Sequence, residues 1–166
     1  MHTAALVLAD GAHVGVRPIG ADDRHALSVW FGRLSPESRR KRFLAPKPRL
    51  SERELTYLTE VDHVSHTALI AVDESGQLIG EARYATAEPG GRIADFAVTV
   101  ADEWQGRGVG NRLAARLIDA ARANGMTRMT AITLWDNTAA IALLHRLGFR
   151  RAGYDGDAIE YELGLT

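Results

Sequence analysis

The sequence has no cysteine among its 166 residues. This absence excludes disulfide bonds, thiolate zinc ligands and a cysteine nucleophile, and it fits a reducing cytoplasm, which is the expected location. Neither sign of charge dominates, because 20 Lys and Arg residues oppose 21 Asp and Glu residues and leave a net charge of −1. We therefore expect neither nucleic acid nor an anionic membrane surface as a partner.

Long hydrophobic runs are also missing. No apolar stretch is long enough to cross a bilayer, and no positively charged segment precedes the short run at residues 4–8. The sequence therefore predicts neither a membrane span nor a signal peptide. What it does have, 46% hydrophobic and 25% charged residues, is typical of a globular protein, and its length favours one domain over residues 1–166.

Hydrophobic periodicity and turn residues divide the chain into strands and helices. Asp10-Gly11 predicts a two-residue hairpin, and Leu27, Trp30 and Phe31 recur at the spacing of one helix face. Strands are expected at residues 6–8, 14–19, 67–72, 77–87, 92–100, 129–134, 149–154 and 158–163, and helices after residues 22, 35 and 51 and at 108–124 and 137–147. The predicted class is α/β with a mixed sheet that is antiparallel in its first half.

The most informative segment is the glycine-rich turn within residues 98–111. An apolar strand leads into it and an amphipathic helix leads out, and the first amides of that helix have no partner within it, which is typical of an anion site. A dinucleotide-binding fingerprint needs a further glycine where Asn111 or Leu113 stands, and a P-loop needs a Gly-Lys pair that this turn lacks. What remains is Gln105, Gly108 and Gly110 in the order Q-x-x-G-x-G.

This pattern resembles the acetyl-coenzyme A signature of the GNAT superfamily of N-acetyltransferases. A second block, residues 137–149, begins with Asn and ends in Gly-Phe, and it is similar to the second coenzyme motif of that superfamily. The resemblance implies a mixed, mostly antiparallel, splayed central sheet with helices on both faces, and acetyl-CoA as the acyl donor. It implies these coenzyme-binding residues: Val98, Thr99, Val100, Gln105, Gly106, Arg107, Gly108, Val109, Gly110, Asn111, Asn137, Ala140 and Leu144.

A narrower resemblance, to bacterial Pat-type protein lysine acetyltransferases, rests on shorter stretches. They are Arg42-Phe43, residues 51–55, 59–63 and 66–71, and Ala82-Arg83-Tyr84. This likeness implies a primary amine as acceptor, either a protein lysine or a small-molecule amine. Two departures leave a non-catalytic acyl-CoA-binding module open: Asp95 stands where the Pat-type branch commonly has Glu, and Leu144 stands where many family members have a proton-donating Tyr.

Asp95, nine residues before Trp104, is the main candidate for the catalytic base. An amine attacks a thioester only when neutral, and a lysine of pKa about 10.4 is neutral at pH 7 in roughly one part in 2,500. Asp95 is the ionisable residue of an otherwise apolar strand, where partial desolvation would raise the pKa of a carboxylate. The alternative is a structural Asp bonded to Arg83 or Arg92. Glu81 is the second candidate base, and its alternative is a solvent-facing residue of an edge strand.

Several polar residues can be interpreted in two ways from the sequence. The basic run at residues 39–42 is a solvated face, or it attracts an acidic protein surface or a ribose phosphate. Arg107 binds phosphate or is solvated, and Asn137 serves the coenzyme or only begins a helix. His145 is expected to be exposed on a helix rather than to act as an acid.

The remaining expectations concern metals, aromatic residues and assembly. Asp62, His63 and His66 have metal-ligating side-chain types but no fourth ligand in sight, so no metal is expected. Trp104 and Trp135 are expected in or near the core. Exposed edge strands at the carboxyl end favour a homodimer. Without a cysteine, the amine is expected to attack acetyl-CoA directly, with no covalent enzyme intermediate.

Overall fold

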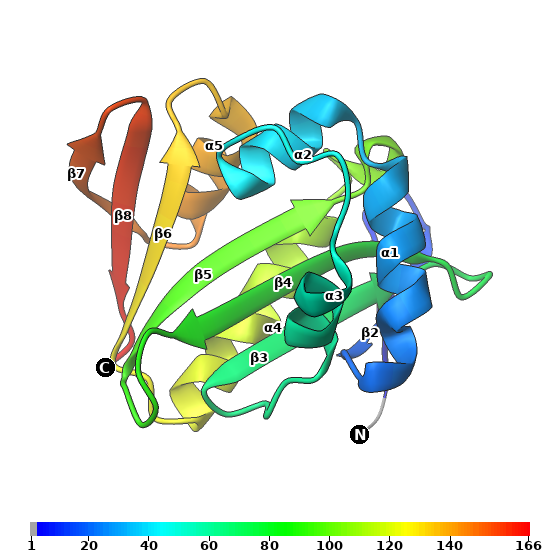
Figure 1. Ribbon diagram of the computed structural model, residues 1–166, viewed down its shortest axis with the longest axis horizontal. Coiled ribbons are helices and arrows are strands. Elements are labelled where there is room, and N and C mark those ends of the chain that lie inside the picture. The colour runs from blue at the N-terminus through cyan, green and yellow to red at the C-terminus, as the bar shows by residue number, and fades with distance from the viewer. Residues whose placement is uncertain (1–2) are drawn as a thin grey trace.

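The computed structural model describes residues 3–166 and arranges their strands in an eight-stranded sheet (Figure 1). The strands are β1 (Ala4–Val7), β2 (His13–Pro18), β3 (His66–Val72), β4 (Leu78–Thr86), β5 (Ile93–Val100), β6 (Arg128–Leu134), β7 (Arg150–Asp155) and β8 (Ala158–Gly164). Their order is β1-β2-β3-β4-β5-β6-β8-β7, and β5 with β6 is the parallel pair among these antiparallel neighbours. The predicted mixed, mostly antiparallel sheet is confirmed. The parallel pair needs a crossover, which α4 (Val109–Ala123) supplies.

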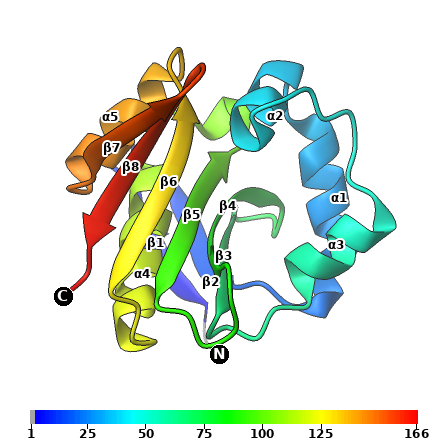
Figure 2. The same cartoon turned by 60° about the vertical axis from the view of Figure 1, so that its left-hand side comes forward.

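Helices cover both faces of the sheet, as predicted (Figure 2). One face carries α1 (Arg24–Arg33), α2 (Pro36–Phe43) and α3 (Glu52–Thr59), and the other carries α4 and α5 (Thr138–Arg146). A capping box starts α3, because Ser51 Oγ accepts from the Glu54 amide and the Glu54 carboxylate accepts from the Ser51 amide, both at 3.1 Å. Within residues 3–166, no helix combines the length and the apolar character that a bilayer crossing requires.

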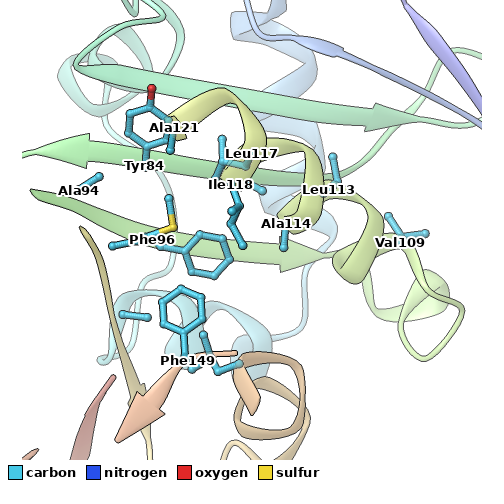
Figure 3. Packing of buried hydrophobic residues seen from close by; sticks show 14 of the residues in the cluster. Tyr84, Ala94, Phe96, Val109, Leu113, Ala114, Leu117, Ile118, Ala121 and Phe149 are labelled. Atoms are coloured by element: carbon cyan, nitrogen blue, oxygen red, sulfur yellow. The ribbon is translucent and has the colours of Figure 1, made fainter. Parts of the chain in front are cut away.

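Two hydrophobic cores hold the central strands from both faces. On one side, Leu113 and Leu117 of α4 are fully buried against the sheet, and Phe96 of β5 packs on Phe149 with ring centroids 5.5 Å apart (Figure 3). On the other side, the predicted stripe of α1, including Trp30, is buried as well. Burial of one such side chain contributes roughly 1.5–3 kcal/mol, so both cores fix the strands that border the candidate site.

Two local predictions are wrong. The Asp10-Gly11 hairpin has a three-residue loop rather than a two-residue one, because the Leu8 amide donates to the Ala12 carbonyl at 2.8 Å. Gly11 still supplies the positive φ of +87° that this turn requires. Trp135 is 63% exposed rather than near the core, because it lies in the turn that follows β6.

The strands β5 and β6 pair along part of their length and then diverge toward α2 (Figure 1). Their paired residues are Ile93 with Arg128, Ala94 with Met129 and Asp95 with Thr130. Beyond Asp95, β5 pairs only with β4 among the described residues, so the backbone groups of residues 96–100 that face β6 lack a strand partner. Because α2 contacts both strands across the opening, it bounds this splayed region.

Candidate active site

Three adjoining cavities follow the splayed region. The glycine-turn cavity has a volume of about 370 Å³ and lies between the end of β5, the glycine turn and α5. The junction cavity, of about 60 Å³, shares Val98 and Asn137 with it. The arginine cavity, of about 460 Å³, shares Arg42 and Phe96 with the junction cavity. One path along β5 therefore joins the glycine turn to the arginine cavity.

The glycine turn presents the free amides of a helix start to the first cavity. Gly108 is the N-cap of α4 with a φ of +93°, and no side chain caps this helix end. Gly106 also has a positive φ, of +73°. The amides of Val109, Gly110 and Asn111 precede the first internal hydrogen bond of the helix, from the Arg112 amide to the Gly108 carbonyl at 3.1 Å. These donors and the helix dipole make the turn suitable for a pyrophosphate.

Two cations add to the positive potential of the glycine-turn cavity. Lys41 reaches it from α2 and Arg146 from α5, and none of its lining residues within the described chain is acidic. Sequence reasoning missed Arg146 and treated Lys41 only as part of a basic run. A signal was present, because the lining residues of α5 recur three or four positions apart and so share one side of the helix: Ala139, Ala140, Ala142, Leu143 and Arg146.

Most of the residues predicted to bind the coenzyme line this cavity. They are Val98, Thr99, Val100, Gln105, Gly106, Gly108, Gly110, Asn111, Asn137 and Ala140. Asn137 also caps α5, since its Oδ1 accepts from the Ala140 amide at 3.2 Å. The side chain of Asn137 therefore caps α5 and also borders the cavity, so its position fits both interpretations.

Three of the predicted residues lie elsewhere. The Arg107 Nε donates to Asp10 at 2.7 Å, and its guanidinium lies 4.1 Å from the Trp104 ring centroid, so it is neither free nor fully solvated. Val109 is 2% exposed and packs in the core (Figure 3). Leu144 is 3% exposed and lines the junction cavity instead. The Val109 side chain is therefore buried, and only the backbone amide of this residue faces the turn.

Polar contacts fix α2 relative to the glycine turn. The Gln105 Nε2 donates to the Val100 carbonyl at 2.9 Å and to Ser38 Oγ at 3.3 Å. Asp102 accepts from the amide and hydroxyl of Ser35 at 3.0 and 2.8 Å and from the Ser38 hydroxyl at 3.0 Å. Because of these bonds, the residues of α2 keep their positions beside the cavities.

Asp95 lines the arginine cavity, but it is exposed. Its carboxylate accepts a hydrogen bond from the Thr130 hydroxyl on β6, rather than from Arg83 or Arg92. The expected partial burial is wrong, because Asp95 is the last paired residue before β5 and β6 diverge and faces their opening. Its carboxylate lies at the rim of the cavity and is accessible to solvent.

Glu81 lies on the central strand β4 and is 4% exposed, so the edge-strand alternative is wrong. It forms an ion pair with Arg83, whose Nε lies 3.4 Å from Glu81 Oε1. Burial raises the pKa of Glu81, but the attraction of Arg83 and Arg42 outweighs it and leaves the pKa below its usual range. A charged carboxylate already engaged by a guanidinium is a poor proton acceptor, so Asp95 is the better candidate base.

Arg42 is not part of a solvated face, as the basic run had suggested. It is half-buried, lines both the arginine and junction cavities, and has its carbon Cζ 4.8 Å from the Phe43 ring centroid. Its Nε is buried and has no hydrogen-bond partner among residues 3–166. Burial lowers the pKa of Arg42, while Glu81 opposes this effect.

His66 completes the polar wall of the arginine cavity. Its Nε2 lies 2.9 Å from Arg83 Nη1, and because a guanidinium only donates, this nitrogen is the acceptor. Burial and the nearby Arg83 lower the pKa of His66 to about 4. His66 is therefore neutral at pH 7, and its ring lies 4.8 Å from that of Tyr57.

Asp62, His63 and His66 were weak candidates for a metal site, and the carboxylate of Asp62 has a different role. Asp62 Oδ1 accepts from the amides of Val64, Ser65 and His66, each at 2.9 Å, and so shapes the loop before β3. In the part of the chain that the structure describes, no group of three or more His, Cys, Asp or Glu side chains is arranged to hold a metal ion.

A splayed mixed sheet with an uncapped, glycine-rich helix start at its opening is the arrangement that the resemblance to N-acetyltransferases implied. The sequence model of the acetyltransferase (GNAT) family matches residues 28–149. The chain belongs to this family, whose members are N-acetyltransferases that use acetyl-CoA.

Three relatives show how far the likeness extends. An acetyltransferase of Pseudomonas aeruginosa is 38% identical over 163 residues, which cover 95% of this chain and 87% of that protein. The crystal structure of the GNAT domain of S. lividans PAT has a TM-score of 0.91 at 32% identity and covers 98% of this chain and 96% of that one. The acetyltransferase Pat of Mycolicibacterium smegmatis is 37% identical over 95 residues, which are 57% of this chain and 28% of that protein. The predicted Pat-type likeness is thereby confirmed.

Proposed function

We propose that this chain transfers an acetyl group from acetyl-CoA to a primary amine that enters from the arginine cavity. The observation that carries the proposal is the continuity of the three cavities along the unpaired side of β5. The pyrophosphate would lie at the start of α4 between Lys41 and Arg146, and the thioester would lie near the junction cavity. Residues 1–166 would act as one domain.

The reaction needs one base and one set of amide donors. The neutral amine attacks the thioester carbonyl, a C–N bond forms, the C–S bond breaks, and coenzyme A leaves as a thiolate. Asp95 takes the ammonium proton, directly or through a water, and passes it to solvent. The free amides of Val98 and Val100 polarise the carbonyl. Leu144 cannot protonate the thiolate, but a thiol of pKa about 8.5 is a fair leaving group near pH 7.

The acceptor is either a protein lysine or a small amine. The likeness to Pat-type proteins supports a protein lysine. The non-catalytic alternative, an acyl-CoA-binding module, rests on Asp95 and Leu144 replacing the expected Glu and Tyr. The homodimer through β7, the edge strand next to β8, stays a prediction, as does the cytoplasmic location.

One assay tests the proposal. Thiol release from acetyl-CoA is followed with lysine peptides, polyamines and amino acids as acceptors, and each product is checked by mass spectrometry for one added acetyl group. We expect acceptor-dependent thiol release. Saturable acetyl-CoA binding without release for any acceptor would support the non-catalytic module instead.

A further inference from the structure

The wall of the arginine cavity carries charges of both signs, because Arg42, Arg83, Glu54 and Asp95 all line it. Glu54 is paired with Lys47, Glu81 is buried beside Arg83 and paired with it, and His66 is neutral at pH 7. Arg83 is 4% exposed and is engaged by Glu81 and by the Leu58 carbonyl at 3.1 Å. Arg42 is therefore the guanidinium of this wall without a direct ion-pair partner among the described residues, and Glu81 attracts it only from a longer distance.

Acetyl transfer to a simple amine gives no reason for this charge. A guanidinium beside the acceptor repels an ammonium ion. This repulsion is offset when the acceptor itself brings an anion to the guanidinium of Arg42. A carboxylate suits a guanidinium best, because the two planar groups form paired hydrogen bonds.

The opposite charge lies a short distance along the same face. Asp95 on β5 is two residues from Ala97, and Ala97 is the register partner of Arg83. Two residues of a strand span about 7 Å. Small side chains, Ala85 and Ala97, line the cavity between them and leave room for a ligand. Arg42 lines the same cavity of about 460 Å³ as Arg83 and Asp95, so a cation and an anion border one space that can hold a small molecule.

We propose that the acceptor is an amino acid-like molecule whose free carboxylate binds Arg42 while its amino group lies at Asp95. This inference rests on the proposed acetyl transfer and specifies its acceptor. The mouth of the arginine cavity is partly apolar, because Leu44, Tyr57 and Ile132 line it and are 39%, 59% and 53% exposed. An amino acid with an apolar side chain would complement this mouth.

Matched acceptors test the inference. L-leucine, L-methionine and L-phenylalanine are each compared with their carboxamides by thiol release. We expect kcat/KM to be about 100-fold higher for the acids, as the loss of a charge-assisted, bidentate partner implies. The carboxamides have the less basic amines and so the larger neutral fraction, which means that deprotonation alone would favour them. Equal rates, or a preference for the carboxamides or for a lysine peptide, would overturn the inference.

Variants place the effect at Arg42. In Arg42→Gln, the acid-to-amide ratio of kcat/KM should fall to within about fivefold of one through a rise in KM for the acids, and Arg42→Lys should retain part of it. Arg53→Gln, an exposed arginine on α3, is the matched control and should keep the full ratio. A ratio unchanged in Arg42→Gln, with thermal unfolding showing a folded protein, would also overturn the inference.

Failure of the proposed function has a different signature. If the protein acetylates no acceptor at all, the proposed reaction is wrong, and the inference is decided by binding alone. Calorimetric titration of the coenzyme A-loaded protein with L-methionine and with L-methioninamide then gives the answer. Binding of the acid but not the amide would support the inference, and equal or absent binding would refute it.

Discussion

Replacing Asp95 with asparagine removes the proposed base and little else. Asparagine keeps an oxygen that can accept the hydrogen bond from the Thr130 hydroxyl, and the residue is exposed, so we expect the fold to survive. General-base catalysis contributes about 10²- to 10⁴-fold, and an exposed carboxylate that shares its role with water belongs at the lower end. We therefore expect kcat at pH 7 to fall about 100-fold, which corresponds to about 2.7 kcal/mol.

The coenzyme and pH dependence separate this effect from a general defect. Asp95 lines the arginine cavity but not the glycine-turn cavity, so the Kd for acetyl-CoA should stay unchanged. For a lysine acceptor, the neutral fraction rises about 100-fold between pH 7 and pH 9, so less of the rate depends on the base. We expect the difference in kcat between variant and wild type to shrink over this range.

Thiol release under saturating acetyl-CoA measures these rates. Asp95→Glu, which restores a longer carboxylate, should keep most of the turnover. Asp119→Asn, an exposed carboxylate on α4, is the matched control and should behave like the wild type. An Asp95→Asn protein with wild-type kcat at pH 7 would remove Asp95 from the mechanism.

Further predictions concern stability and coenzyme binding. Glu81→Gln leaves Arg83 without its ion-pair partner, so we expect a loss of about 3–5 kcal/mol in the free energy of unfolding by urea; a loss under 1 kcal/mol would contradict the buried ion pair. His66 has its pKa lowered to about 4 in the folded protein, below the unfolded value of about 6.5. Its contribution to the free energy of unfolding should therefore be fully present above pH 6.5 and should fall between pH 6.5 and pH 4, because the unfolded chain gains the proton first. His66→Gln should flatten that profile, and an unchanged slope would show that another group causes it. Gly108→Ala places a side chain at a φ of +93°, which costs about 1–2 kcal/mol and should lower Tm by roughly 2–8 °C. In Gly110→Ala the new Cβ would lie 3.5 Å from Val100, an ordinary contact, so Tm should hold while acetyl-CoA binds more weakly; the reverse pattern in calorimetry would contradict the assignment of the two glycines.

Local sequence signals were enough to predict most of the fold. The start of α3 was readable because Ser51 and Glu54 form a capping box within one helical turn. The glycine turn was readable because Gly106 and Gly108 need positive φ values that other residues avoid. These features depend on neighbours in the sequence, and the structure keeps them where the sequence predicted them.

Features that depend on distant residues could not be predicted in the same way. The partner of Arg107 is Asp10, 97 residues away, and no local pattern connects them. Arg42 belongs to a basic run, and its burial follows only from the packing of α2 over β5 and β6. The exposure of Asp95 depends on where two strands diverge, a property of the sheet rather than of the strand's own alternation.

The binding of acetyl-CoA in the glycine-turn cavity is the claim on which the rest depends. Calorimetric titration of the purified protein with acetyl-CoA, with free coenzyme A and NAD as comparisons, tests it most directly. We expect a single site with a Kd in the micromolar range for acetyl-CoA and no heat of binding for NAD. Absence of acetyl-CoA binding by folded protein would mean that the glycine turn is only structural, and it would contradict the proposed acetyl transfer.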